Sequence, residues 1–457
     1  MIREQGFLRT EGDVNLTEGR KEWQRNHLSA EAFRLLEEDQ AYFLQQSLST
    51  PCLNVIGRSY DIYIEDIDGR KYMDFHGNSV HQVGYGNESV IRAIKEQLDI
   101  LPFSPRRYTN KPAIELARKL VELAPGKLNK VLFAPGGTSA VSMALKLARK
   151  ATGKFKTVSL WDSFHGASLD AISVGGEALF REGMGPLLPG SLHIMPYNSY
   201  RCFLGGSAES ATKSLDYLEY VLERERDVGA IILEPIRCTD VQIPPKFYYE
   251  RLRRICDEHG TLLIFDEIPT ALGRTGKMFA FENYDILPDI VLLGKGLGGA
   301  VFPMAAMLVN DSLDVAEEIA LGHFTHEKSS VGCAAALATL QYMEKYQLLE
   351  RSRTLGVYMK SRLEEMKERF PVIGDVRGIG LLYGVELVKD RGTKEKALTE
   401  AEAVMYHCME KGLSFKVSQG NVLTLAPPLV ITDVQLEEAM DILEESIREV
   451  CGSLTGR

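Results

Sequence analysis

A lysine in the stretch DIVLLGKGLGGA, Lys295, stands where an apolar run meets a series of small residues. The apolar run predicts a buried strand, so the amine is expected at the carboxyl end of that strand. Glycines on both sides let a flat ligand approach the backbone. An amine in such a place is suited to attack an aldehyde and form a Schiff base. A solvated strand-end lysine is the alternative interpretation.

An acidic pair follows a second apolar run, in LLIFDEIP. Asp266 is expected at the end of a strand that neighbours the strand before Lys295, on the same edge of the sheet. A carboxylate there can hold a pyridine nitrogen in its protonated form, so that the ring withdraws electrons. The alternatives are a helix cap and a solvated acidic pair.

A glycine pair lies in FAPGGTSAVSMALKLARK, between a predicted strand and a long predicted helix. Small residues such as Gly137 allow an anion to reach backbone N–H groups at the positive end of the helix, and the Thr138 hydroxyl adds a donor. The stretch therefore indicates a phosphate site. A plain strand-to-helix turn with a Ser or Thr cap is the alternative.

Two other glycine-rich stretches resemble nucleotide-binding motifs only weakly. GKGLGG matches the dinucleotide spacing, but a strand-like run with Pro303 follows it, where a helix is required. GRTGKM fails as a phosphate-binding P-loop because Ala271 takes the first glycine position and Met278 replaces Ser or Thr.

Short apolar runs alternate with helical patterns from residue 113 onward, as expected of a parallel sheet covered on both faces. The strands are expected at 130–134, 156–161, 229–235, 261–267 and 289–295. The fold class is therefore α/β. An amphipathic helical segment before Pro51 and a hairpin around Asp68 and Gly69 precede this part, and an α+β pattern follows residue 346. We expect residues 1–75 to belong to a small domain, 76–340 to form a large domain, and 341–457 to complete the small one.

Composition narrows the class of protein. A formal net charge of −10, without a cluster of basic residues, argues against nucleic-acid binding. The seven cysteines are scattered and form no CxxC pair, which argues against a disulfide framework or a metal site and suits a reducing cytoplasm. No apolar run is long enough to predict a membrane span or an export signal.

Together these motifs, and above all FDEIPTALGRTGKMFAFENYDILPDIVLLGKGLGG, resemble the class III aminotransferases, enzymes of fold type I that use pyridoxal 5'-phosphate. The resemblance implies a large cofactor-binding domain, a smaller α+β domain, and a homodimer with active sites at the subunit interface. It implies that Lys295 forms the Schiff base and that Asp266 contacts the ring nitrogen. The remaining cofactor contacts that it implies are the phosphate loop at Gly137 and Thr138, the stacking ring of Phe164, and Thr325 reaching the phosphate of the neighbouring subunit.

The chain departs from the family pattern at three places. Pro269 stands where a glutamine is expected to contact the cofactor ring oxygen, and the segment after Glu234 leaves Asp240 as its nearest acid. Thr424 replaces the arginine expected to bind a substrate α-carboxylate. A hydroxyl cannot form that bidentate clamp, which a transaminase normally needs for its keto acid.

These departures favour a small primary amine without an α-carboxylate as substrate. A β-elimination needs no keto acid, and some family members are lyases that release phosphate or ammonia from amino-alcohol compounds. The stretches RRYTN and KVSQGNVLTL resemble the phosphonate-linked ammonia-lyase branch, with Arg106, Arg107 and Lys416 as candidate anion contacts. The alternatives are an aminotransferase that uses a keto acid, a phospho-lyase, and a binding protein without catalysis.

Overall fold

The structure, a computed structural model, describes residues 17–47, 49–202 and 204–455. The predicted N-terminal segment therefore lies partly outside the described residues. The chain divides into two compact units. The larger unit holds Asn78–Cys238 and Gln242–Glu350, and the smaller unit holds Met1–Gly77, Thr239–Val241 and Arg351–Arg457.

A seven-stranded sheet forms the centre of the larger unit. Its order is β4 (Leu128–Ala134), β10 (Ala305–Asn310), β9 (Ile290–Leu293), β8 (Leu262–Asp266), β7 (Val228–Leu233), β5 (Lys156–Leu160) and β6 (Ser191–Ile194). All strands run parallel except β10, which is antiparallel to both neighbours. The α/β class is confirmed, and the five predicted strands run parallel; the antiparallel β10 is an addition to the strands that the sequence analysis expected. The link from Gly294 to Met304 is too short for a crossover helix, so the chain returns in the opposite direction.

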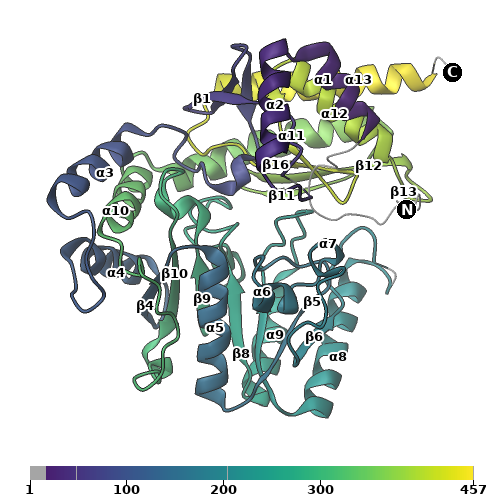
Figure 1. The fold of residues 1–457 in the computed structure, drawn as a ribbon. Helices are drawn as coiled ribbons and strands as arrows, with labels where there is room; N and C mark the ends of the chain where they lie inside the picture. The colour runs from purple at the N-terminus through teal and green to yellow at the C-terminus, as the bar shows by residue number, and fades with distance from the viewer. Residues whose placement is uncertain (1–16, 48, 203, 456–457) are drawn as a thin grey trace. The chain divides into compact units, whose positions relative to one another are not determined.

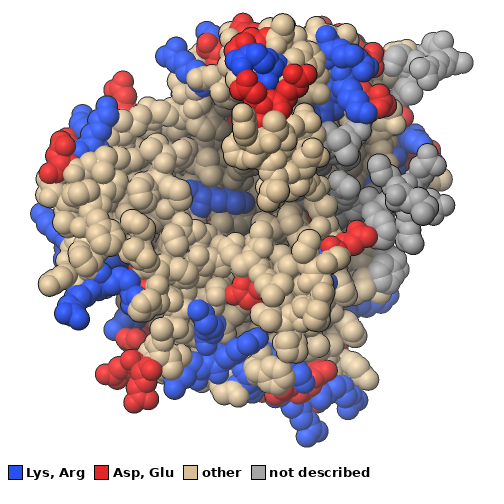
Figure 2. All heavy atoms as spheres, in the orientation of Figure 1, with Lys and Arg blue, Asp and Glu red and all other residues tan. Residues whose placement is uncertain are grey.

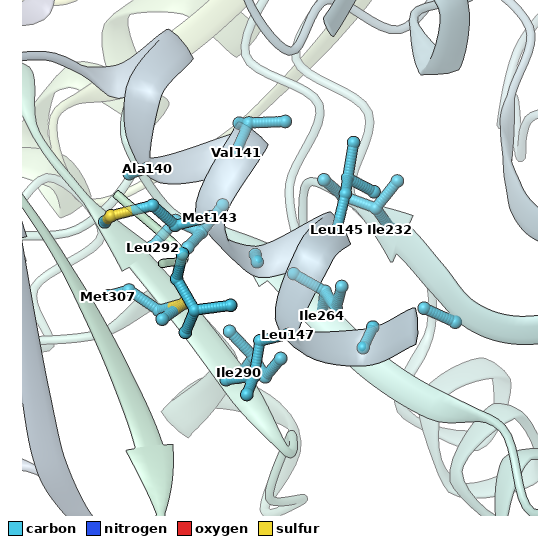
Figure 3. Packing of buried hydrophobic residues seen from close by; sticks show 14 of the residues in the cluster. Ala140, Val141, Met143, Leu145, Leu147, Ile232, Ile264, Ile290, Leu292 and Met307 are labelled. Carbon is cyan, nitrogen blue, oxygen red and sulfur yellow. The ribbon is translucent and has the colours of Figure 1, made fainter. Parts of the chain in front are cut away.

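The helix α5 (Gly137–Thr152) packs along this sheet and buries one apolar face. Val141, Ala144 and Leu145 recur at helical spacing, and they belong to one buried cluster with strand residues such as Ile264 and Leu292. Figure 3 shows this cluster. Gly153 ends the helix because its left-handed conformation, with φ +66°, suits a residue without a side chain. The cluster fixes the first turn of α5 relative to the strand ends.

Other helices surround the sheet (Figure 1). α9 (Lys246–His259) packs on β8, and α8 (Ser207–Glu225) packs on β6 and α9. α3 (Glu88–Ile100) and α4 (Lys111–Leu123) pack against α10 (Ser330–Lys345). Two short helices, α6 (Leu169–Val174) and α7 (Ala178–Arg181), follow β5.

The smaller unit contains two sheets. In the first, the predicted hairpin is confirmed as β2 (Tyr63–Asp66) and β3 (Lys71–Asp74), flanked by β1 (Ile56–Tyr60) and by β14 (Leu413–Ser414), which pairs parallel with β3. The second has the order β11 (Ile373–Ile379), β12 (Leu382–Asp390), β16 (Val422–Leu425) and β15 (Lys416–Ser418), with β13 (Glu395–Lys396) on β12. The helices of this unit are α1 (Glu18–His27), α2 (Ala30–Tyr42), α11 (Leu348–Arg369, which begins at the boundary), α12 (Leu398–Glu410) and α13 (Asp433–Thr455).

A three-residue segment, Thr239–Val241, belongs to the smaller unit although the chain on both sides of it belongs to the larger one. Arg377 Nε donates to the Asp240 carbonyl at 2.9 Å, and Thr424 Oγ1 donates to the Thr239 carbonyl at 3.0 Å. The sequence gives no sign of this excursion, because the hydrogen bonds that hold it come from residues far along the chain.

Basic and acidic side chains are mixed on the face of each unit that Figure 2 shows. None of the described helices is long and apolar enough to cross a membrane. Within the same described ranges, no group of three or more His, Cys, Asp or Glu side chains is arranged to hold a metal ion.

Candidate active site

Lys295 and Asp266 lie at the ends of neighbouring parallel strands, as predicted. Asp266 is the last residue of β8 and pairs in register with Leu292 of β9, and Lys295 follows β9 by two residues. Lys295 is exposed and has a φ of +45°, a conformation that residues with side chains rarely adopt. Such strain is concentrated at functional sites.

The stretch after Gly294 forms a short 3₁₀ turn, Lys295–Gly298, and then leads into β10. It does not open an α-helix, so it lacks the element that binds a dinucleotide pyrophosphate. The weak match to a dinucleotide motif therefore has no structural counterpart.

Asp266 is buried and hydrogen-bonded on both oxygens. Its Oδ2 lies 2.8 Å from His165 Nδ1, and its Oδ1 accepts from the Ile268 N–H at 3.2 Å. His165 follows β5, and its side chain is fully buried. The sequence prediction missed His165, although its place in SFHG, directly after Phe164, was a usable signal.

Glu234 is a second carboxyl that the sequence prediction left without a role. It follows β7 directly and is buried, and its Oε2 accepts from the Cys238 N–H at 2.9 Å. Burial, followed by the neighbouring Asp266 carboxylate, raises the pKa of Glu234 to about 7. The signal was an acid at the end of the apolar run GAIILEP.

Among the described residues no side chain caps the first turn of α5, so its first backbone N–H groups are available to a ligand. The N-cap residue is Gly136, which has no side chain that could cap the helix. The alternative of a strand-to-helix turn with a Ser or Thr cap therefore does not apply. Thr138 Oγ1 accepts from the Ala167 N–H at 3.3 Å. Gly166, with φ +123°, lies so close to the Thr138 hydroxyl that a Cβ would collide with it. This backbone end and hydroxyl together suit an anion.

The Ile268 side chain lies between the first turn of α5 and the segment that carries Lys295. A Cβ on Gly137 would lie 2.8 Å from Ile268 Cδ1, and a Cβ on Gly294 would lie 3.2 Å from Ile268 Cγ2. Gly137 begins α5, Ile268 follows Asp266 by two residues, and Gly294 precedes Lys295. The structure therefore brings three of the predicted segments to one place.

The remaining predicted cofactor contacts differ in their surroundings. The Phe164 ring is half-buried and lies 4.5 Å from the Phe180 ring, tilted by 41°. Thr325 is exposed, in a segment where the His326 ring contacts the Phe103 ring edge-on at 5.3 Å.

The candidate substrate contacts are spread over both units. Arg106 and Arg107 are exposed in the larger unit, and Arg106 Nε lies 4.0 Å from Glu327 Oε2. Asp240 is buried and Lys416 begins β15, both in the smaller unit. The structure does not group these four residues within one unit.

Thr424 occupies the position expected to hold a carboxylate-binding arginine, and its hydroxyl is engaged inside the smaller unit. Besides donating to Thr239, Thr424 Oγ1 lies 3.1 Å from Ser418 Oγ. Arg377 does not replace the missing clamp, because its guanidinium lies 3.0 Å from Asp375 and 2.8 Å from Glu386.

These residues fit pyridoxal 5'-phosphate. The uncapped end of α5 with Thr138 suits its phosphate, the buried Asp266 suits its ring nitrogen, and the exposed Lys295 amine suits its aldehyde. When bound, the cofactor supplies an electron sink for a carbanion next to the substrate nitrogen.

Comparisons with known proteins agree with this assignment. The Aminotransferase class-III family model matches residues 45–447. The chain is 52% identical to the (R)-1-hydroxy-2-aminoethylphosphonate ammonia-lyase of Vibrio splendidus, over 97% of this chain and 96% of that protein. It is 38% identical to the leucine/methionine racemase of Thermococcus litoralis, over 91% and 95%.

Among solved structures, the omega transaminase from Pseudomonas jessenii in complex with PMP has a TM-score of 0.86 and 29% identity, covering 91% of this chain and 98% of that one. The family model and the relatives span nearly the whole chain, including every segment of the site described above. The chain therefore belongs to the class III aminotransferase family and is an enzyme that depends on pyridoxal 5'-phosphate.

Proposed function

We propose that this enzyme is a lyase that releases ammonia from an amino-alcohol phosphonate of the 1-hydroxy-2-aminoethylphosphonate type. The observation that supports this proposal most directly is Thr424, which stands where an aminotransferase is expected to have an arginine. Its hydroxyl is hydrogen-bonded to Thr239 and Ser418. A site without that clamp suits an amine without an α-carboxylate. The 52% identity to a lyase of this specificity supports the proposal.

Lys295 is the proposed nucleophile and proton carrier. Its Nζ would hold the cofactor through the aldehyde, and it would remove a proton from the substrate carbon that bears nitrogen and protonate the departing hydroxyl. Water leaves from one carbon, and a second water replaces nitrogen at the other. The products are therefore ammonia and an aldehyde, and no oxidant or keto acid takes part.

Asp266 is the proposed partner of the ring nitrogen, and His165 is the residue that orients it. The 2.8 Å contact from Nδ1 fixes one carboxylate oxygen, and the Ile268 N–H fixes the other. A buried, oriented carboxylate stabilises a cationic ring nitrogen more strongly than a solvated one, because no water screens the pair.

The phosphate group is proposed to lie against the first turn of α5, with Gly137 giving close access to the backbone and Thr138 a hydroxyl donor. Phe164, supported by Phe180, is proposed to stack on the ring. These residues would hold the cofactor by its phosphate and its ring.

A homodimer with shared active sites is part of the proposal. Large apolar side chains are exposed on and after α3, including Ile100 at 78% and Tyr108 at 62%. The same loop contacts the segment around Thr325, because Asn110 Nδ2 donates to the Lys328 carbonyl at 2.9 Å. A partner on this surface would cover Thr325, as expected of a residue that reaches the phosphate of the neighbouring subunit.

The substrate phosphonate needs a cation, and we propose Arg106 and Arg107 of the larger unit and Lys416 of the smaller unit as candidates for that role; Asp240 of the smaller unit remains a candidate substrate contact. Among the described residues, the ion-pair contact of Arg106 is the 4.0 Å approach to Glu327, so its guanidinium remains able to bind an anion.

All seven cysteines are free, which suits the reducing cytoplasm that we propose as the location of this enzyme.

The deciding experiment incubates the holoenzyme with 1-hydroxy-2-aminoethylphosphonate, with and without a keto acid. Release of ammonia and aldehyde without keto acid supports the lyase. Transfer of the amino group to pyruvate or 2-oxoglutarate would instead identify an aminotransferase, which the likeness to the omega transaminase favours. Release of phosphate from ethanolamine phosphate would identify a phospho-lyase.

A further inference from the structure

Glu234 is a buried carboxyl with no part in the roles proposed above. It directly follows β7 and is 7% exposed. The backbone around it is anchored, because the Tyr249 hydroxyl of α9 donates to the Pro235 carbonyl at 2.6 Å.

The sheet register places the Glu234 carboxyl beside that of Asp266. Leu233 of β7 pairs in parallel with Phe265 of β8, so the next residue on each strand is an acid. Side chains at matching positions of neighbouring strands point to the same face and lie close together. Two adjacent ionised carboxylates repel each other in a site from which water is excluded.

The two acids have unequal partners. Asp266 has the His165 ring at 2.8 Å and the Ile268 N–H at 3.2 Å. The Glu234 carboxyl accepts only the Cys238 N–H, and among the described residues no basic side chain forms an ion pair with it. An ionised carboxylate that is buried with one donor is strongly disfavoured, whereas a protonated carboxyl in that place is not.

We propose that Glu234 works as an uncharged carboxylic acid, which leaves Asp266 as the single anion available to the cofactor ring nitrogen. This proposal rests on the proposed function, because it takes Asp266 as the partner of that nitrogen. The same pattern, a pair of neighbouring carboxyls that keeps one proton, is a general way to give two acids different roles.

Electrostatics at the site agree with this assignment. Burial and then Asp266 raise the pKa of Glu234 to about 7, while the Cys238 N–H, His165 and Lys295 lower it by smaller amounts. These groups face Glu234 from its own loop and from the ends of β8, β5 and β9. As the pH rises, Glu234 ionises and adds a second negative charge beside Asp266.

Infrared difference spectroscopy on the wild type and the Glu234→Gln variant tests the protonation state directly. The amide keeps the shape of the side chain and an oxygen that can accept from Cys238. We expect the difference spectrum between the wild type and E234Q at pH 6 to contain the carbonyl stretch of a protonated carboxyl, and this band should disappear from the difference as the pH rises. A carboxylate band in this difference spectrum at pH 6 would overturn the proposal.

Glu267→Gln is the matched control. Glu267 is also buried and follows Asp266, but both oxygens of its carboxyl group accept hydrogen bonds, from the Ala280 and Phe281 N–H groups at 2.6 and 2.7 Å. The band assigned to Glu234 should persist in E267Q. If E234Q fails to fold, a pH titration of the E267Q protein carries the same test.

The pH profile of the holoenzyme provides a second readout. E234Q should keep most of the wild-type kcat at pH 6 and lose less of it on going to pH 8. A loss of activity at both pH values would overturn the proposal, because it would require an ionisable group at this position. Failure of the proposed function is distinguishable, since the wild type would then release no ammonia or aldehyde without a keto acid, whereas the infrared result does not depend on turnover.

Discussion

Asp266 and His165 form a buried pair, with Oδ2 and Nδ1 2.8 Å apart. The other ring nitrogen of His165, Nε2, is buried and has no hydrogen-bond partner among the described residues. We therefore assign the ring proton to Nδ1, which donates to the carboxylate. The contact orients the acid that is proposed to hold the cofactor ring.

Replacing His165 should weaken cofactor binding. H165A removes a hydrogen bond to a charged group, worth about 1.5–3 kcal/mol, so the Kd for pyridoxal 5'-phosphate should rise about 10- to 100-fold. H165N is the control, since its amide can donate to Asp266 and should recover part of the affinity. Titration of the visible absorption band measures both, and unchanged affinity in H165A would refute the orienting role.

Removing the Lys295 amine should abolish covalent capture of the cofactor. K295A is expected to lose the visible band and at least about 10³-fold in kcat, because a nucleophile and a proton carrier are lost together. K150A changes an exposed lysine in the last turn of α5 and should behave as the wild type. Full turnover by K295A would remove the basis of the proposed mechanism.

The Thr424 hydroxyl should stabilise the smaller unit. T424V leaves the Thr239 carbonyl and the Ser418 hydroxyl without this partner, so the free energy of unfolding should fall by about 1–3 kcal/mol. T424S keeps the hydroxyl and should lose less stability. Urea denaturation of the three proteins distinguishes these results, and equal stability of T424V and the wild type would contradict the bonded role.

Stability should decrease as the pH rises above neutrality. Burial raises the pKa of Glu267 to about 8, from an ordinary value of 4.5. A carboxyl with a raised pKa gives its full stabilisation below 4.5 and loses it as the pH rises through about 8. Between pH 6 and pH 8 this group alone should lower the free energy of unfolding by about 2 kcal/mol.

Urea unfolding at these two pH values measures the decrease, and E267Q should show a shallower one. A free energy of unfolding that stays constant or increases from pH 6 to pH 8 in the wild type would show that Glu267 ionises normally.

A charge on the exposed apolar surface after α3 should disrupt the proposed dimer. I100D places a carboxylate where a second copy is expected to bury an isoleucine, so sedimentation should show a shift toward monomer. V357D, an exposed position on α11, is the control and should leave the wild-type mass. Monomers should also bind cofactor more weakly if Thr325 of one chain serves the site of the other.

The positions of Lys295 and Asp266 could be predicted because each follows a short apolar run. Two such runs in an α/β pattern become neighbouring parallel strands, and their carboxyl ends share one edge. The start of α5 was predictable for a similar reason, since a glycine pair separates a strand pattern from a helical one. Local spacing carries this information.

The reversal of β10 and the contact of His165 with Asp266 depend on residues that are distant in sequence. The short link after Lys295 indicates that β10 could reverse, but the direction of β10 is decided by its pairing with β4 and β9. His165 and Asp266 are 101 residues apart, and only the order of strands brings them together. The excursion Thr239–Val241 depends in the same way on Arg377 and Thr424.

The parallel pairing of β3 with β14 sets an order of events during synthesis. Met73 donates its N–H to the Gly412 carbonyl at 2.7 Å, but Gly412 leaves the ribosome about 340 residues after Met73. At bacterial or eukaryotic elongation rates this delay lasts roughly 20 to 70 s. During this time the edge of β3 that pairs with β14 stays without its partner strand. A nascent chain truncated before residue 413 should therefore be a preferred target of chaperones.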